Sequence, residues 1–167
     1  MKVRQSNDVR LRDVTGDDLM IFYEHQRDPE STQMAAFPSR DWEAFMAHWS
    51  AIRANTAIIV KAIIADRQIV GNVLSFVQNG ERHVGYWLGR EYWGKGIATL
   101  ALAEFLELDT VRPLYARVAK HNIGSKRVLE KCGFAVCGED IIPSVAGSGE
   151  IGEFVMRLDA NSRTAST

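Results

Sequence analysis

Apolar and polar residues follow short patterns that predict β-strands in both halves of the chain. Residues 9–14 alternate as a half-buried strand does, whereas residues 57–65 form a continuous β-branched run. Asn79-Gly80 is a strong hairpin signal, because both residues tolerate positive φ. Residues 57–88 are therefore predicted to form an antiparallel meander of three strands. The predicted strands are residues 9–14, 57–65, 69–77, 83–88, 114–118, 135–142 and 151–158.

Between these strands, apolar residues recur at steps of three and four, which predicts helices. Thr15 and Asp41 are the predicted N-caps of two helices, and a loop with Pro29 and Pro38 separates them. Two later helices are predicted over residues 94–108 and 122–132, and a turn at residues 147–149. The order β-α-α-β-β-β-α-β-α-β-β predicts an α+β fold with a mixed sheet.

Composition and charge narrow the class of protein without naming its chemistry. The chain has 167 residues, 46% of them hydrophobic, and a net charge of −1, which gives no support for broad attraction to nucleic acid or membranes. Cys132 and Cys137 have no zinc-like spacing, so we expect reduced thiols, no metal and a cytoplasmic location. We predict a single domain over residues 1–160 and a disordered tail over residues 161–167.

The most informative stretch is residues 90–98, a glycine-bearing loop between a predicted strand and a predicted helix. Backbone N–H groups in the first turn of a helix lack intrahelical partners, and the helix dipole makes that end electropositive. Gly94 and Gly96 let a ligand approach the main chain. The stretch therefore predicts a site for a phosphate-bearing cofactor, to which Lys95 is a further candidate contact.

Three segments together carry a family resemblance. They are Gly-Tyr-Trp-Leu at residues 85–88, Tyr-Trp-Gly-Lys-Gly-Ile-Ala at residues 92–98, and the run from Asn122 to Phe134. In this order and spacing the chain resembles the GNAT N-acetyltransferase superfamily, and within it the branch of ribosomal-protein alanine N-acetyltransferases. The match extends from about residue 58 onward, and the two N-terminal helices agree in placement only.

The resemblance implies acetyl-coenzyme A (acetyl-CoA) as the acetyl donor. Its pyrophosphate would bind backbone N–H groups of residues 93–98, and its pantetheine arm would enter a V-shaped split between strands 83–88 and 114–118. A free N–H near Tyr86 or Trp87 would polarise the thioester carbonyl. Many relatives carry Arg or Gln where this chain has Trp93, so main-chain amides are expected to bind the phosphates. The implied cofactor contacts are Tyr86, Trp87, Leu88, Trp93, Gly94, Lys95, Gly96, Ile97, Ala98 and Asn122.

Two residues are candidates for proton transfer. An alkylamine of pKa about 10.4 must lose a proton before it attacks, at a cost of roughly 4–5 kcal/mol near neutral pH. His83 lies where relatives often place a glutamate, so it is the candidate base, with an exposed histidine beside the hairpin as the alternative reading and Glu81 as the reserve. Ser125 is the candidate acid for the departing thiolate, or only a residue of the helix start. Asn122 is expected both to cap its helix and to reach the cofactor.

The predicted reaction is direct attack of an amine on acetyl-CoA, with a protein N-terminus or a small amine as acceptor. The acceptor would dock between the N-terminal helices and the final hairpin. An alternative is a non-catalytic module that binds acyl-CoA, and a more remote one is a nucleotide-binding protein, which the chain's incomplete phosphate motifs disfavour. Dimers are common among relatives, so a homodimer is a further expectation.

Overall fold

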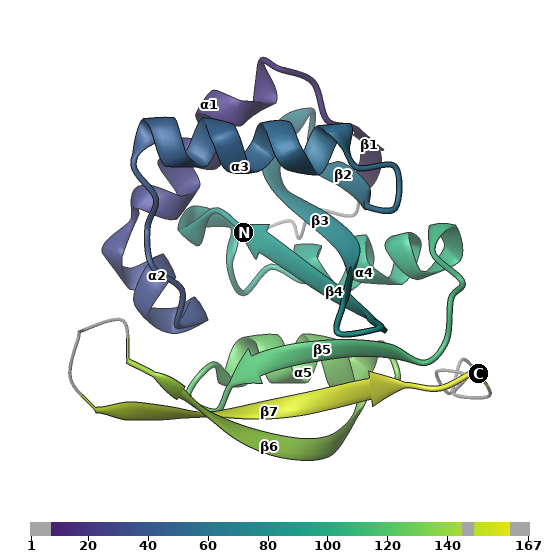
Figure 1. The fold of residues 1–167 in the computed structure, drawn as a ribbon. Helices are drawn as coiled ribbons and strands as arrows, with labels where there is room; N and C mark the ends of the chain where they lie inside the picture. The colour runs from purple at the N-terminus through teal and green to yellow at the C-terminus, as the bar shows by residue number, and fades with distance from the viewer. Residues whose placement is uncertain (1–7, 145–148, 161–167) are drawn as a thin grey trace, which may run out of the picture.

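The computed structural model describes residues 8–144 and 149–160, which form one mixed sheet flanked by helices (Figure 1). The strand order within these residues is β1-β2-β3-β4-β5-β7-β6. The predicted tail at residues 161–167 and most of the predicted turn at residues 147–149 lie outside the described residues. The elements are β1 (Val9–Asp13), α1 (Asp18–Arg27), α2 (Pro29–Ala35), α3 (Trp42–Ala54), β2 (Ile59–Ala65), β3 (Gln68–Gln78), β4 (Glu81–Leu88), a 3-10 turn (Arg90–Tyr92), α4 (Ile97–Leu108), β5 (Leu114–Ala119), α5 (Ile123–Lys131), β6 (Ala135–Pro143) and β7 (Glu150–Leu158).

The predicted meander is confirmed, because β2, β3 and β4 pair antiparallel in sequence order. Asn79 and Gly80 both have positive φ, at 53° and 76°, as the hairpin signal requires. Tyr86 pairs with Val73 in register, and His83 pairs with Phe76. Since side chains alternate across a strand, Tyr86 and Trp87 face opposite sides of the sheet.

The sheet divides between its two halves. Strands β4 and β5 are parallel and in register only at Arg82 with Leu114 and at His83 with Tyr115. Beyond these pairs the strands diverge toward the left of Figure 1, while β5, β7 and β6 continue as an antiparallel half-sheet. The mixed, mostly antiparallel sheet and its V-shaped split are therefore as predicted.

Each face of the sheet has its own apolar core. On one face, α4 and α5 cover a large cluster that includes Val73, Leu102 and Phe105. On the other, α1 and α3 cover a smaller one with Phe22 and Trp49, whose rings lie 5.1 Å apart. Because the two halves of the sheet diverge, the helices on both faces come to border the split.

The N-terminal helices differ from the prediction in two places. Residues 29–35, expected to be loop, form α2, which starts with Pro29 at its first position and is capped by the Asp28 carboxylate. Thr15 does not cap α1, whose N-cap residue is Asp17; the Asp18 carboxylate instead accepts the Thr15 N–H and pairs with Arg12. The prediction missed α2 because Pro29 was interpreted as a loop residue rather than as a helix start.

Other predicted helix ends are confirmed. The Asp41 carboxylate accepts the Ala44 N–H at the start of α3, and the Asn122 side chain accepts the Ser125 N–H at 3.2 Å. Gly133 has φ of 97° directly after α5. No helix within the described residues is long and apolar enough to cross a membrane.

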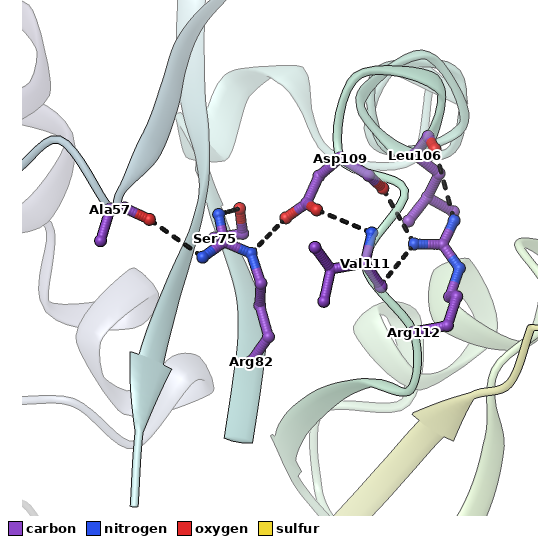
Figure 2. A network of polar contacts seen from close by, with 7 residues as sticks. All are labelled: Ala57, Ser75, Arg82, Leu106, Asp109, Val111 and Arg112. Carbon is purple, nitrogen blue, oxygen red and sulfur yellow. Dashed lines mark hydrogen bonds and ion pairs between the residues drawn. The ribbon is translucent and has the colours of Figure 1, made fainter. Parts of the chain in front are cut away.

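A buried polar network fastens the closed end of the split (Figure 2). Arg82, at the start of β4, donates to Asp109 at 2.7 Å, to Ser75 on β3 at 2.9 Å and to the Ala57 carbonyl at 2.9 Å. Burial opposes ionisation of Asp109, but hydrogen bonds from Ser75, Arg82 and the Val111 N–H outweigh it and hold its pKa below the ordinary value. The network joins three elements at the point where β4 and β5 part.

Candidate active site

A cavity of about 650 Å³ occupies the split. Its lining comes from α1, α3 and residues 35–40 on one side of the sheet, from β3, β4 and β5, and from the start of α5 on the other side. Trp49 of α3 and Leu129 of α5 both line it, although they belong to cores on opposite faces. The cavity therefore passes through the sheet where β4 and β5 separate.

The edge of β4 that faces the cavity lacks a partner strand. Beyond His83 no residue of β5 pairs with it in register among the described residues, although its other edge pairs with β3 as far as Leu88. Main-chain groups of residues 84–87 on that edge are consequently open to an extended ligand. This arrangement is what the predicted pantetheine contacts at Tyr86 and Trp87 require.

Tyr86 and Ser125 are brought together across the cavity wall. The Tyr86 hydroxyl and the Ser125 Oγ lie 2.7 Å apart, on β4 and α5 respectively. Burial raises the pKa of Tyr86 to about 12, so its phenol keeps its proton at neutral pH. Both residues line the cavity beside Asn122, so three of the predicted site residues meet at one place.

The glycine loop has the geometry of an anion cradle. Gly94 and Gly96 have φ of 73° and 79°, and a Cβ added to either would meet no atom within 4 Å. The Leu100 N–H donates to the Gly96 carbonyl and closes the first turn of α4, which leaves the amides of Ile97 and Ala98 without an intrahelical acceptor. The open space at the two glycines thus lies beside backbone amides that have no acceptor within the helix.

Trp93, directly before this loop, is held by hydrogen bonds to preceding residues. Its indole N–H donates to the Leu88 carbonyl at 3.0 Å, and its backbone N–H donates to the Arg90 carbonyl at 3.1 Å. Both donors of Trp93 are thus engaged within the protein, which leaves the amides after it as the candidate phosphate contacts. Leu88 itself is buried in the core, and the Lys95 ammonium lies 5.9 Å from the centre of the Tyr92 ring.

His83 does not line the cavity. Its ring lies between those of Phe76 and Tyr115, with centroids 5.8 and 5.7 Å away. Burial and then the charge of Arg117 lower its pKa, against an opposing effect of Glu81, whose carboxylate lies 4.0 Å from the His83 Nε2. The predicted base role of His83 stays a prediction, and the structure separates it from Tyr86 and Ser125.

Two further side chains of the cavity were not predicted. His48 lines it from α3, where burial and then the charge of Arg40 lower its pKa, and Arg40 lines it from the segment after α2. Neither could be assigned from helical periodicity, because their place depends on how α1, α2 and α3 pack together.

Neither cysteine lines the cavity. Burial raises the pKa of the Cys132 thiol to about 11, and Cys137 is exposed on β6. Within residues 8–144 and 149–160 no cluster of three or more metal-binding side chains was found.

Comparison with known proteins gives one consistent result. A family model described as an acetyltransferase (GNAT) domain matches residues 8–135. A search of curated proteins found no match. Among solved structures, the chain is similar to a spermidine N-acetyltransferase from Vibrio cholerae in complex with CoA and spermine, with a TM-score of 0.79 and 15% identity over 92% of this chain and 96% of that chain.

Two further solved structures share the fold. A GNAT-family acetyltransferase from Bacillus anthracis has a TM-score of 0.77 and 18% identity, covering 93% of this chain and 96% of that chain. A structure of AAC(6')-Ib in complex with paromomycin and acetyl-CoA has a TM-score of 0.76 and 20% identity, covering 96% of this chain and 99% of that chain. The family model spans the split strand and the glycine loop, so the chain belongs to the GNAT acetyltransferase family and is an acetyl-CoA-dependent N-acetyltransferase.

Proposed function

We propose that the protein transfers the acetyl group of acetyl-CoA to a primary amine by direct attack, and that the reaction takes place in the cavity between β4 and β5. The observation that carries this proposal is the passage of the cavity through the sheet. A thioester threaded along β4 from the α4 side would reach an amine held between α1 and α3. Donor and acceptor would then meet from opposite faces without competing for space.

The donor is proposed to bind through main chain. Its pyrophosphate lies against the amides from Gly94 to Ala98, because the loop offers open space at both glycines. Its pantetheine arm pairs with the free edge of β4, and its thioester carbonyl accepts a main-chain N–H near Tyr86 or Trp87. Asn122 faces the same arm from the start of α5.

Tyr86 and Ser125 are proposed to act as a pair on the departing thiolate. A thiol of pKa about 8.5 is a reasonable leaving group, so a hydrogen bond to the developing charge is sufficient. Tyr86 keeps its proton because of burial. When the Tyr86 hydroxyl donates its hydrogen bond to the Ser125 Oγ, the hydrogen of the serine hydroxyl is free to point into the cavity. The Ser125 hydroxyl can then donate a hydrogen bond to the developing thiolate.

His48 is proposed to take up the proton of the attacking amine. It lines the cavity from α3, whereas His83 does not. Burial and the nearby charge of Arg40 lower the pKa of His48, so its ring is neutral and able to accept a proton at physiological pH. No covalent acetyl-enzyme is needed, because neither cysteine reaches the cavity.

The alternative function, a non-catalytic module that binds acyl-CoA, makes a different prediction. Both functions predict a rise in melting temperature on adding CoA. Only the acetyltransferase releases free thiol from acetyl-CoA in a way that requires an added amine. The decisive experiment is therefore thiol release from acetyl-CoA with a panel of N-terminal peptides and small amines. CoA binding without amine-dependent release would favour the alternative.

A further inference from the structure

The charges that line the cavity are unusual for a site that accepts an amine. None of the described lining residues is an aspartate or glutamate, whereas Arg40 and Arg117 both line it. Arg117 is neutralised by Glu153 at 2.7 Å and Asp140 at 3.1 Å. Within the described part of the chain, the Arg40 guanidinium has no hydrogen bond or ion pair, and its burial lowers its pKa. The cavity therefore presents one uncompensated positive charge.

Hydrogen bonds to its backbone hold Arg40 in place. The buried Gln26 of α1 accepts the Arg40 N–H at 2.7 Å and donates to the Arg40 carbonyl at 3.1 Å. Ser39 donates to the same Gln26 oxygen at 3.3 Å. The guanidinium lies 4.9 Å from the centre of the Phe37 ring, which supports it from one side. A buried amide thus fixes the segment that carries the charge, as a built recognition site requires.

The rest of the acceptor side is apolar. Most of the side chains that α1, α3 and β3 contribute to the cavity are aromatic or aliphatic; they include Phe22, Phe45, Trp49, Ile52, Leu74 and Phe76. Such walls favour a ligand with an apolar body. A second ammonium group would find no carboxylate among the described lining residues and would be repelled by Arg40. Polycations therefore match this cavity poorly, although two of the similar structures contain spermine and an aminoglycoside.

We propose that the acceptor is a monoamine with an apolar body and a carboxylate, and that Arg40 binds this carboxylate. The proposal rests on the proposed function, because it assigns the acceptor of the same site. A planar guanidinium forms two parallel hydrogen bonds with a carboxylate, which orients the ligand as well as binding it. Gln26 is a positioning residue for Arg40.

Pairs of amines that carry either a carboxylate or its neutral amide test the proposal, with rates compared per unprotonated amine. Phenylalanine is compared with phenylalaninamide, and 4-(aminomethyl)benzoate with 4-(aminomethyl)benzamide, so that short and long separations between amine and carboxylate are both sampled. We expect at least one carboxylate to have a kcat/KM about tenfold or more above its amide, and spermidine to be acetylated more slowly than either. Equal rates within both pairs, or a preference for spermidine, would overturn the proposal and leave the proposed function standing.

Variants of Arg40 assign the preference to this residue. Arg40→Gln should remove the advantage of the carboxylate over its amide, and Arg40→Lys should keep part of it. Arg10→Gln, which changes an exposed arginine of β1, is the matched control and should keep the full preference. A preference that survives Arg40→Gln would show that another group binds the carboxylate.

A measurement without turnover separates the two proposals. 3-Phenylpropanoate, which has no amine, should raise the melting temperature of the CoA-bound protein more than 3-phenylpropanamide does, and Arg40→Gln should abolish the difference. An equal shift with both compounds would contradict the carboxylate site. If no amine at all supports thiol release although CoA binds, the acetyltransferase proposal fails and the acceptor assignment with it.

Discussion

The two ends of β4 differ in how their polar groups are used. At its start, Arg82 donates to three acceptors on different elements and is almost wholly buried among them (Figure 2). Toward its end, the Trp87 indole N–H is buried and has no partner among the described residues, nor does one edge of the strand pair with any of them. Satisfied groups stabilise a fold, whereas unsatisfied buried donors cost free energy unless a ligand pairs with them. β4 therefore stabilises the fold through hydrogen bonds at its start and presents unpaired polar groups to ligands toward its end.

This difference makes stability and function separable along a single strand. Changes at the closed end should lower the free energy of unfolding and leave the chemistry intact at temperatures where the protein is folded. Changes at the open end should impair binding or turnover and leave the free energy of unfolding nearly unchanged. Each prediction below tests one side of this division.

The largest effect is expected at the closed end. Asp109→Asn leaves the Arg82 guanidinium buried without a counter-charge, so the free energy of unfolding should fall by about 3–5 kcal/mol. Because the folded pKa of Asp109 is lowered, its contribution is full above the unfolded pKa and is lost as pH falls through the folded value. The variant should therefore lack that part of the acid dependence in urea unfolding measured at several pH values.

The exposed pair Glu24–Arg27 on α1 provides the control for this measurement. Glu24→Gln should change the free energy of unfolding by no more than about 0.5 kcal/mol. Loss of turnover in Asp109→Asn at a temperature where it is fully folded would contradict the division between the two ends of β4.

The glycine loop should show the next largest effect, on acetyl-CoA affinity. Gly96→Glu forces a side chain into φ of 79°, which costs about 1–2 kcal/mol, and adds a negative charge beside the phosphates. The dissociation constant of acetyl-CoA should rise several hundred-fold by calorimetry. Gly96→Asn is the matched control, because asparagine tolerates positive φ and adds no charge, and it should raise the constant by about tenfold at most. Unchanged affinity in Gly96→Glu would refute the phosphate site.

How far the sequence could predict these regions depends on the range of the interactions. The hairpin at Asn79-Gly80 and the Asp41 and Asn122 caps rest on contacts a few residues apart, and they were predicted. Helix α2 was missed although Asp28-Pro29 is also a local signal, because proline marks helix starts as well as loops.

The content of the cavity could not be predicted in the same way. Gln26 positions Arg40 across 14 residues, and Tyr86 meets Ser125 across 39. The environment of His83 comes from Phe76 and Tyr115 on two neighbouring strands. Resemblance to a family predicts where the cofactor binds, but the acceptor side depends on long-range packing.

A pair of histidine variants tests which one acts on the amine. His48→Gln should lower kcat/KM by about 100-fold, near the lower end of general-base contributions. His83→Gln should lower it by less than about threefold, since its ring is packed between those of Phe76 and Tyr115 and does not itself line the cavity. Burial lowers the pKa of both histidines, so in the wild type the base stays neutral above pH 6.5, and the rate per unprotonated amine should fall only below that pH.

The outcome of this comparison is decisive for the sequence-based prediction. If His83→Gln loses the rate and the acid limb moves, His83 is the base as predicted from the sequence, and the proposal for His48 fails. Melting temperatures of both variants with saturating CoA establish that the loss does not come from unfolding.

A smaller effect is expected for the hydroxyl pair. Ser125→Ala and Tyr86→Phe should each lower kcat by about tenfold with little change in KM, since they assist a leaving group that already departs readily. Because the two hydroxyls act together, the double variant should lose little more than either single one. Additive losses would show that they act independently, and a silent Ser125→Ala would remove the acid role.

The smallest effects are expected for substitutions of two tryptophans, Trp87 and Trp93. Their comparison tests directly whether the two ends of β4 differ in how their polar groups are used. Trp87→Phe removes a buried donor for which the described part of the chain offers no partner, so the free energy of unfolding of the unliganded protein should change by less than about 1 kcal/mol. Trp93→Phe removes a donor bonded to the Leu88 carbonyl and should cost about 1–2 kcal/mol. When the ligands are bound, the indole N–H of the wild-type Trp87 has an acceptor. Trp87→Phe should therefore raise the KM for the substrate that accepts this N–H about fivefold. If Trp87→Phe destabilises the unliganded protein as much as Trp93→Phe does, the open end of β4 is not held unsatisfied for a ligand.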